Sequence, residues 1–190
     1  MRRLVRCVTW GLLLLAASCN RGGIGKGEVS GRFFVRECSS GGDRALAPYS
    51  FSADLLGTRR LRENLQIALY DDAVDFEETD TLLILIGNVD PLLADPTRPL
   101  VRRVSRGPED VNLALSLFVT CPKRPTLHGL SGEIRFEKFD IAPDPADTGR
   151  QEALAGTLTA SVVSADLTEP AGSIELSFDF IPGDPPLLLR

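Results

Sequence analysis

The sequence predicts an all-β protein, an antiparallel β-sandwich of about eight strands, with a small up-and-down β-barrel as the alternative. Apolar residues alternate with polar ones over most segments of strand length, and the 3.6-residue spacing of amphipathic helices is nearly absent. Clusters of Gly, Pro and Asp separate these segments, as turns separate strands. Both observations favour strands that bury one face.

The strongest strand patterns lie in four segments. Residues 65–70, 111–121 and 174–180 alternate along their length, which predicts strands with one buried face. Residues 82–86 are Leu-Leu-Ile-Leu-Ile, apolar throughout, and predict a central strand covered on both faces. Weaker alternation predicts four further strands, at residues 28–37, 49–55, 131–141 and 153–163.

A short pattern recurs at the expected starts of four strands: a small residue, glycine, any residue and an apolar residue. It occurs at Ser30, Ser131, Ala155 and Ala171. The spacings are unequal, which excludes a repeat protein. Glycine at such a place permits a bulge or a close approach of the neighbouring backbone.

The first 18 residues have the features of an export signal. Arg2, Arg3 and Arg6 precede an apolar run from Val8 to Ala17, and a small residue follows. The run is too short to span a membrane as a helix, which needs about 20 apolar residues. We therefore expect a signal peptide over residues 1–18.

Residues 15–19, Leu-Ala-Ala-Ser-Cys, resemble the lipobox of bacterial lipoproteins. The resemblance implies cleavage after Ser18, a diacylglyceryl group on the Cys19 sulfur and Cys19 as the new N-terminus. One departure is Ala16, which stands where the usual consensus has Leu, Val or Ile. The alternative is an ordinary secretory signal, cleaved after Ala17 or Ser18, in which Cys19 carries no lipid.

Residues 19–27 then form a lipidated cysteine and a glycine-rich tether, and residues 28–190 a single all-β domain. Acyl chains on Cys19 would hold the domain at a membrane. In the lipoprotein family, Asn20 rather than Asp implies the outer membrane, if the cell has one. The expected location is the cell envelope.

Charge excludes one class of partner. Loss of the three signal arginines lowers the basic residues from 21 to 18 against 26 acidic ones, so the net charge changes from -5 to -8. Nucleic-acid binding depends on Lys and Arg that neutralise phosphates, so we expect no nucleic-acid partner. A polybasic membrane surface is excluded for the same reason.

Cysteine usage agrees with export. Cys7 leaves with the signal and Cys19 would be lipidated, so Cys38 and Cys121 remain as a predicted disulfide. The alternative is two buried free thiols. Two cysteines and one histidine without close spacing make no zinc site, and we expect no metal and no cofactor.

Two further features of the sequence could form chemical sites. Residues 71–80 hold six carboxylates, which could bind calcium, but they lack the spacing and glycine of an EF-hand and favour a solvated loop. His128 is the only histidine, expected in an exposed loop. A Gly-x-Ser-x-Gly motif is absent, so nothing indicates a catalytic triad.

Much of the mature chain resembles a group of uncharacterised bacterial lipoproteins, a resemblance that implies no activity. The residues that carry it are 64–67 (Asn-Leu-Gln-Ile), 80–84 (Asp-Thr-Leu-Leu-Ile), 120–122 (Thr-Cys-Pro), 131–136 (Ser-Gly-Glu-Ile-Arg-Phe), 155–157 (Ala-Gly-Thr) and 177–180 (Ser-Phe-Asp-Phe).

The functional expectation is a non-enzymatic, envelope-anchored binding or structural module. The alternative is a carrier that holds a small apolar ligand inside a β-barrel. An enzyme is the third hypothesis.

Overall fold

The computed structural model describes residues 25–35, 38, 49–52, 55–71, 78–94, 100–108, 110–142, 152–164 and 171–183. Their elements are β1 (Lys26–Val35), β2 (Tyr49–Ser52), β3 (Leu55–Leu61), β4 (Asn64–Tyr70), β5 (Thr81–Ile86), α1 (Asp90–Ala94), β6 (Leu100–Val104), β7 (Val111–Ser116), β8 (Thr126–Asp140), β9 (Ala153–Ser164) and β10 (Gly172–Ile181). The prediction of an all-β protein is confirmed.

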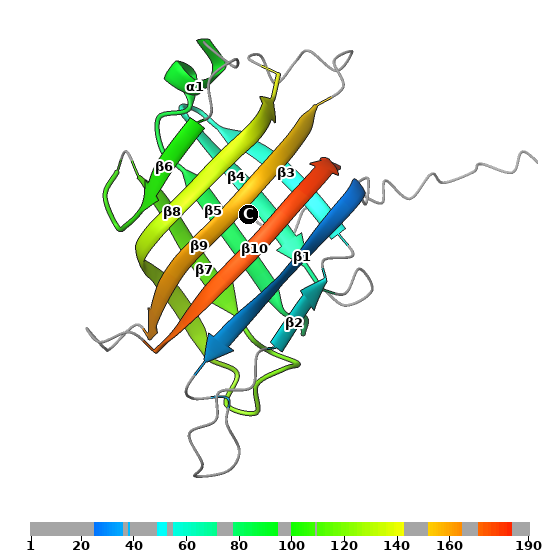
Figure 1. Cartoon of the computed structure of the whole chain (residues 1–190), viewed down its shortest axis with the longest axis vertical. Helices are drawn as coiled ribbons and strands as arrows, with labels where there is room; N and C mark the ends of the chain where they lie inside the picture. The colour runs from blue at the N-terminus through cyan, green and yellow to red at the C-terminus, as the bar shows by residue number, and fades with distance from the viewer. Residues whose placement is uncertain are drawn as a thin grey trace, which may run out of the picture.

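The strands form one sheet in the order β2-β1-β10-β9-β8-β6-β7-β5-β4-β3. Neighbouring strands are antiparallel except β6 and β7, which meet in parallel at Val104 and Val111. Figure 1 shows the long strands β8, β9, β10 and β1 crossing in front of β3, β4, β5 and β7. The sheet therefore has two facing walls that are parts of one continuous structure.

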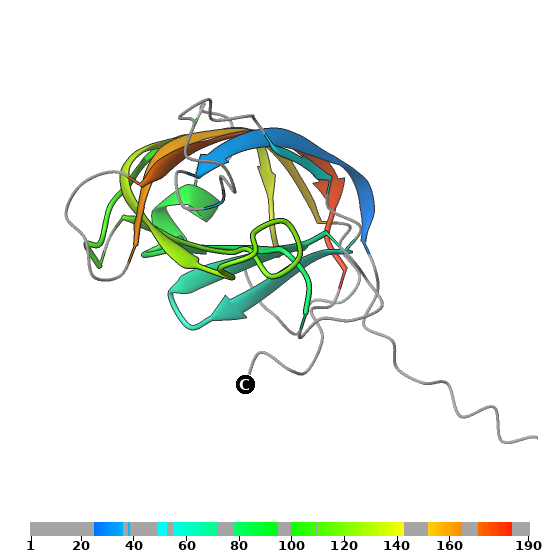
Figure 2. The ribbon, with the colours of Figure 1, turned by 90° about the horizontal axis from the view of Figure 1, so that it is seen from below.

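The two ends of the sheet nearly meet. Gly57 of β3 bridges Gly183, just beyond β10; the Thr58 amide donates to the Gly183 carbonyl at 3.3 Å, and the Gly183 amide to the Leu56 carbonyl at 2.8 Å. Figure 2 shows the resulting curvature. The sheet is barrel-like, which corrects the predicted sandwich of two sheets. Alternation is the same in both architectures, and only these edge hydrogen bonds distinguish them.

Ten strands replace the predicted eight. The segment 49–55 divides into β2 and the start of β3, and β6 was not predicted. The alternation of apolar and polar residues is interrupted in β6 because Arg102 takes the inward position between Leu100 and Val104. Its guanidinium donates to the Asn88 carbonyl at 3.2 Å. The strand predicted at 111–121 ends at Ser116, and the one predicted at 131–141 begins at Thr126.

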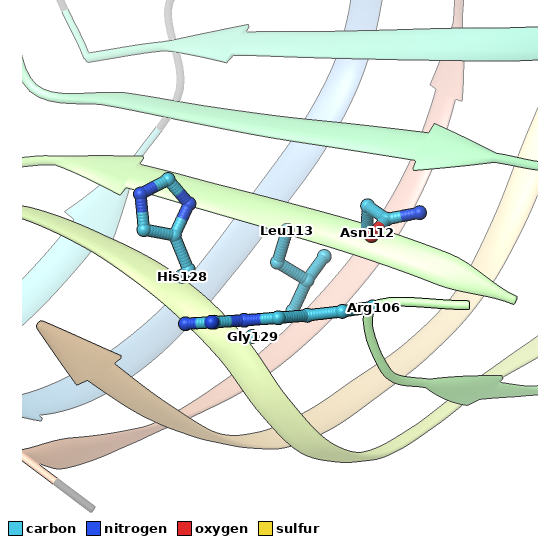
Figure 3. A pocket seen from close by; sticks show the side chains of 5 residues that line it. All are labelled: Arg106, Asn112, Leu113, His128 and Gly129. Carbon is cyan, nitrogen blue, oxygen red and sulfur yellow. The ribbon is translucent and has the colours of Figure 1, made fainter. Parts of the chain in front are cut away.

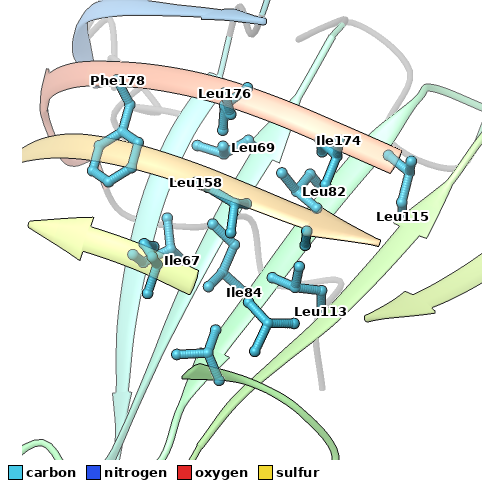
Figure 4. Close-up of a cluster of buried hydrophobic side chains, with 14 of the residues drawn as sticks. Ile67, Leu69, Leu82, Ile84, Leu113, Leu115, Leu158, Ile174, Leu176 and Phe178 are labelled. Carbon is cyan, nitrogen blue, oxygen red and sulfur yellow. The ribbon is translucent and has the colours of Figure 1, made fainter. Parts of the chain in front are cut away.

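Alternating side chains fill the space between the walls. In β10, Ile174, Leu176, Phe178 and Phe180 are buried while Glu175, Ser177 and Asp179 are exposed. Figure 4 shows Ile67, Leu69, Leu82 and Ile84 of one wall facing Leu158, Ile174, Leu176 and Phe178 of the other. Burial of each such side chain contributes about 1.5 to 3 kcal/mol. The prediction for β5 is wrong on one face, where Leu83 and Leu85 are half-buried.

Glycines of the recurring pattern lie where two backbones approach closely. At Gly132, φ is 145°, and an added Cβ would be 2.2 Å from the Thr159 carbonyl oxygen of β9. At Gly156 it would be 2.1 Å from the Arg135 carbonyl oxygen of β8. The expected close approach is confirmed, but Gly132 lies inside β8 rather than at its start.

The short helix α1 lies at one end of the barrel (Figure 1). It begins at Asp90-Pro91, where the sequence predicts only a turn, and buries Leu92. Asp90 forms an ion pair with Arg60 of β3, and the Val89 amide donates to the Glu63 carbonyl at 2.8 Å. Among the described residues, no helix is long and apolar enough to span a membrane.

Candidate functional site

Cys19, the predicted lipid attachment residue, lies outside the described residues. The other predicted pair is brought together: the structure joins Cys38, three residues after β1, to Cys121 in the loop after β7 as a disulfide. Their Cα atoms are 4.8 Å apart, and both residues are buried. The link fastens the end of one wall to the loop that follows the other.

The acidic segment 71–80 is described only at Asp71 and from Glu78 to Asp80. Asp80 is 1% exposed, and its carboxylate accepts hydrogen bonds from the amides of Val119 at 2.8 Å and Thr120 at 3.2 Å and from the Thr120 hydroxyl. It therefore holds the loop that contains Cys121. Within the described parts of the chain, no group of three or more His, Cys, Asp or Glu could hold a metal ion.

His128 lies in β8, not in an exposed loop as predicted. It pairs with Ala114 of β7 on one side and Val163 of β9 on the other, and it is half-buried. Inward-facing Leu127 and Gly129 flank it, so the imidazole lies on the outer face of the sheet. Glycines at 129 and 132 are typical of a loop, but β8 begins before them, at Thr126.

A fork in the sheet opens beside His128. β8 pairs with β7 only at residues 126–128, then with β6 at residues 132–136. In these described ladders, Gly129–Ser131 pairs with neither strand, and the register with β9 shifts at the same place. Because β7 and β8 separate there, the gap between them brings side chains of the outer face next to side chains of the core.

The fork holds a pocket of about 360 Å³ lined by Arg106, Asn112, Leu113, His128 and Gly129. Figure 3 shows the Arg106 side chain extending past Leu113 and Gly129 toward the side where the imidazole lies. Leu113 is 4% exposed and belongs to the core, so the pocket reaches from solvent to the apolar interior. Its lining combines a guanidinium, an imidazole, an amide and an apolar floor.

The turn between β6 and β7 sets the position of Arg106. The Ser105 hydroxyl donates to the Asp110 carboxylate, and the Gly107 amide donates to the Ser105 hydroxyl at 3.0 Å. The Ser105 amide donates to the Val111 carbonyl at 3.0 Å, and the Asn112 side-chain amide donates to the Gly107 carbonyl at 3.3 Å. Hydrogen bonds on both sides of Arg106 thus hold the backbone that carries its guanidinium.

Sequence reasoning missed Arg106 and Asn112. Arg106 is visible in the sequence only as part of an Arg-Gly-Pro turn, and Asn112 only as an outward position of an alternating strand. Both reach the pocket because β6 inserts between β8 and β7, a long-range pairing without a local signal.

No protein-family model, no curated protein and no solved structure matches the chain.

Proposed function

We propose that this chain is a non-enzymatic binding module, anchored in the cell envelope by acyl chains on Cys19, that uses the fork pocket as its binding site. The signal over residues 1–18, the lipobox cysteine and the glycine-rich segment after it support the anchor. In a cell with an outer membrane, that membrane is the proposed location. The module has no nucleic-acid partner.

One observation carries the choice of site: the barrel interior is occupied by side chains of opposite walls, whereas the fork is open to solvent. In a protein with a filled core, a ligand finds room at the surface. Among the described lining residues there is no serine, cysteine, threonine or carboxylate that would serve as a nucleophile, which favours binding over covalent catalysis.

The position of the fork suits an anchored protein. β1, the strand that follows the proposed tether, is three strands from β8 in one direction around the sheet and lies beside the closing edge at β3 in the other. The fork between β8 and β7 is therefore on the side of the barrel opposite β1. A pocket placed there faces away from the strand that leads to the membrane.

Native mass spectrometry of the detergent-purified full chain separates this proposal from the alternative of an apolar-ligand carrier. Covalent acyl groups survive denaturation, whereas a ligand inside the barrel is lost. We expect the same mass in native and denaturing spectra, apart from detergent removed by activation. A stoichiometric lipid-sized adduct present only under native conditions would support the carrier and contradict a filled interior.

A further inference from the structure

We propose that the fork pocket binds a small organic anion, with the anionic group on Arg106 and His128 and the apolar part against Leu113 and Gly129. This inference rests on the proposed binding function and specifies the class of ligand. It follows from the charge, the floor and the size of the pocket.

Arg106 is the only charged residue among the described residues that line the pocket. Within the described part of the chain, Arg106 forms no ion pair; the nearby Asp110 carboxylate accepts instead from the Ser105 hydroxyl. His128 likewise has no hydrogen-bond or ion-pair partner among the described residues, so its ring nitrogens are available to a ligand. A guanidinium beside an imidazole favours a carboxylate or phosphate and disfavours a cation.

The charge of the rest of the molecule favours binding of an anion in the pocket over binding elsewhere on the surface. The expected mature chain carries a net charge of -8, and two exposed arginines elsewhere, Arg32 and Arg135, pair with Glu175 and Glu133. Long-range attraction therefore does not draw anions to the molecule. An anion would be held by direct hydrogen bonds in the pocket, so its affinity should depend on Arg106 specifically.

The apolar floor of the pocket favours a ligand that carries an apolar group. Leu113 belongs to the core, and Gly129 beside it has no side chain that would cover Leu113. A Cβ at Gly129 would lie 2.6 Å from the Val104 Cγ1 and 3.1 Å from the Leu113 Cβ, so the floor is closely packed. An alkyl or aryl group that covers this floor removes apolar surface from water, at about 25 cal/mol per Å².

The size of the pocket limits the ligand. A volume of about 360 Å³ lies near the lower end of the range for small-molecule sites, roughly 300 to 1,000 Å³. Such a pocket accommodates a short carboxylic acid or a small phosphate ester but not a polymer chain. Butyrate is a suitable probe, since it joins a carboxylate to a short alkyl chain.

Because His128 is the only histidine, its two ring C–H protons give the only histidine signals in proton NMR spectra of the full chain carrying a histidine-free tag. We would titrate the detergent-purified chain with butyrate, with butyramide as the uncharged match and with inorganic phosphate as an anion without an alkyl chain. We expect butyrate to shift the His128 signal saturably, phosphate to bind more weakly and butyramide to give no saturable shift.

Arg106→Gln should weaken butyrate binding by at least about tenfold, because it removes a charge-assisted hydrogen bond. Arg103→Gln is the matched control: it removes the same charge from exposed Arg103 of β6, which does not line the pocket, and should leave the affinity within about twofold. Arg106 is exposed, so its variant should keep the wild-type melting temperature.

The proposal is overturned if no anion shifts the His128 signal saturably, or if Arg106→Gln binds butyrate as the wild type does. Phosphate binding as tight as butyrate binding would overturn the role of the apolar floor. A noncovalent lipid adduct in native spectra would refute the filled-interior module independently of this titration, so the two failures are distinguishable.

Discussion

Asp80 shows how one residue of a charged segment acquires a structural role. Six carboxylates stand close together in residues 71–80, and sequence spacing makes none of them special. The structure buries Asp80 and places its carboxylate where two backbone amides of the loop after β7 need an acceptor. Buried charges persist in proteins when hydrogen bonds replace their hydration, as they do here.

Asp80→Ala should lower the free energy of unfolding by about 2 to 3 kcal/mol, since it leaves the amides of Val119 and Thr120 without this acceptor. Asp80→Asn keeps one oxygen and should cost less. Urea denaturation measures both.

The control is Glu78→Ala, because the Glu78 side chain is 66% exposed and pairs only distantly with Arg124, at 3.9 Å. It should change stability by less than about 0.5 kcal/mol. Equal losses for Asp80→Ala and Glu78→Ala would contradict this role.

At the scale of elements, alternation predicted the strands that bury one whole face. Residues 65–70, 153–163 and 174–180 are strands close to their predicted bounds. Prediction failed where pairing rather than burial defines the strand. β6 is short and places Arg102 among its inner positions, and one predicted strand, 49–55, contributes to both β2 and β3, which lie at opposite ends of the strand order. The fork forms where β6 pairs with β8 and β7, so the pocket could not be predicted from the residue pattern of any single strand.

The disulfide also acts between elements, since it joins the segment after β1 to the loop after β7 across 83 residues of chain. The pair was predictable by counting, because the predicted signal peptide and lipobox account for the other two cysteines. Closing a loop of this length is expected to stabilise the fold by about 4 to 5 kcal/mol, by restricting the unfolded chain.

The double variant Cys38→Ala, Cys121→Ala should therefore melt at a clearly lower temperature than the wild type. A reductant should lower the melting temperature of the wild type toward that of the variant and leave the variant unchanged. Calorimetry with and without reductant measures this. A wild-type melt that does not respond to a reductant able to act on the unfolded chain would contradict a stabilising disulfide.

At the scale of the molecule, the sequence predicted the all-β class but favoured a sandwich, with a barrel as the alternative, over the barrel-like sheet that the structure shows. Closure at Gly57 and Gly183 and filling of the interior by both walls are properties of the whole chain. With the interior filled, the fork is an open site in the described part of the chain, on the side of the sheet opposite β1. β1 begins at Lys26, two residues before the predicted domain boundary, so the proposed tether reaches the barrel directly.

Lipid attachment at Cys19 is what would make this chain an anchored module, and metabolic labelling with radioactive palmitate tests it in bacterial cells that express the full chain. We expect label on the wild type and none on Cys19→Ala. Cys7→Ala is the matched control, because it removes a cysteine from the predicted signal peptide, and it should keep the label. Label that persists in Cys19→Ala, or its absence from the wild type, would contradict a lipid-anchored module.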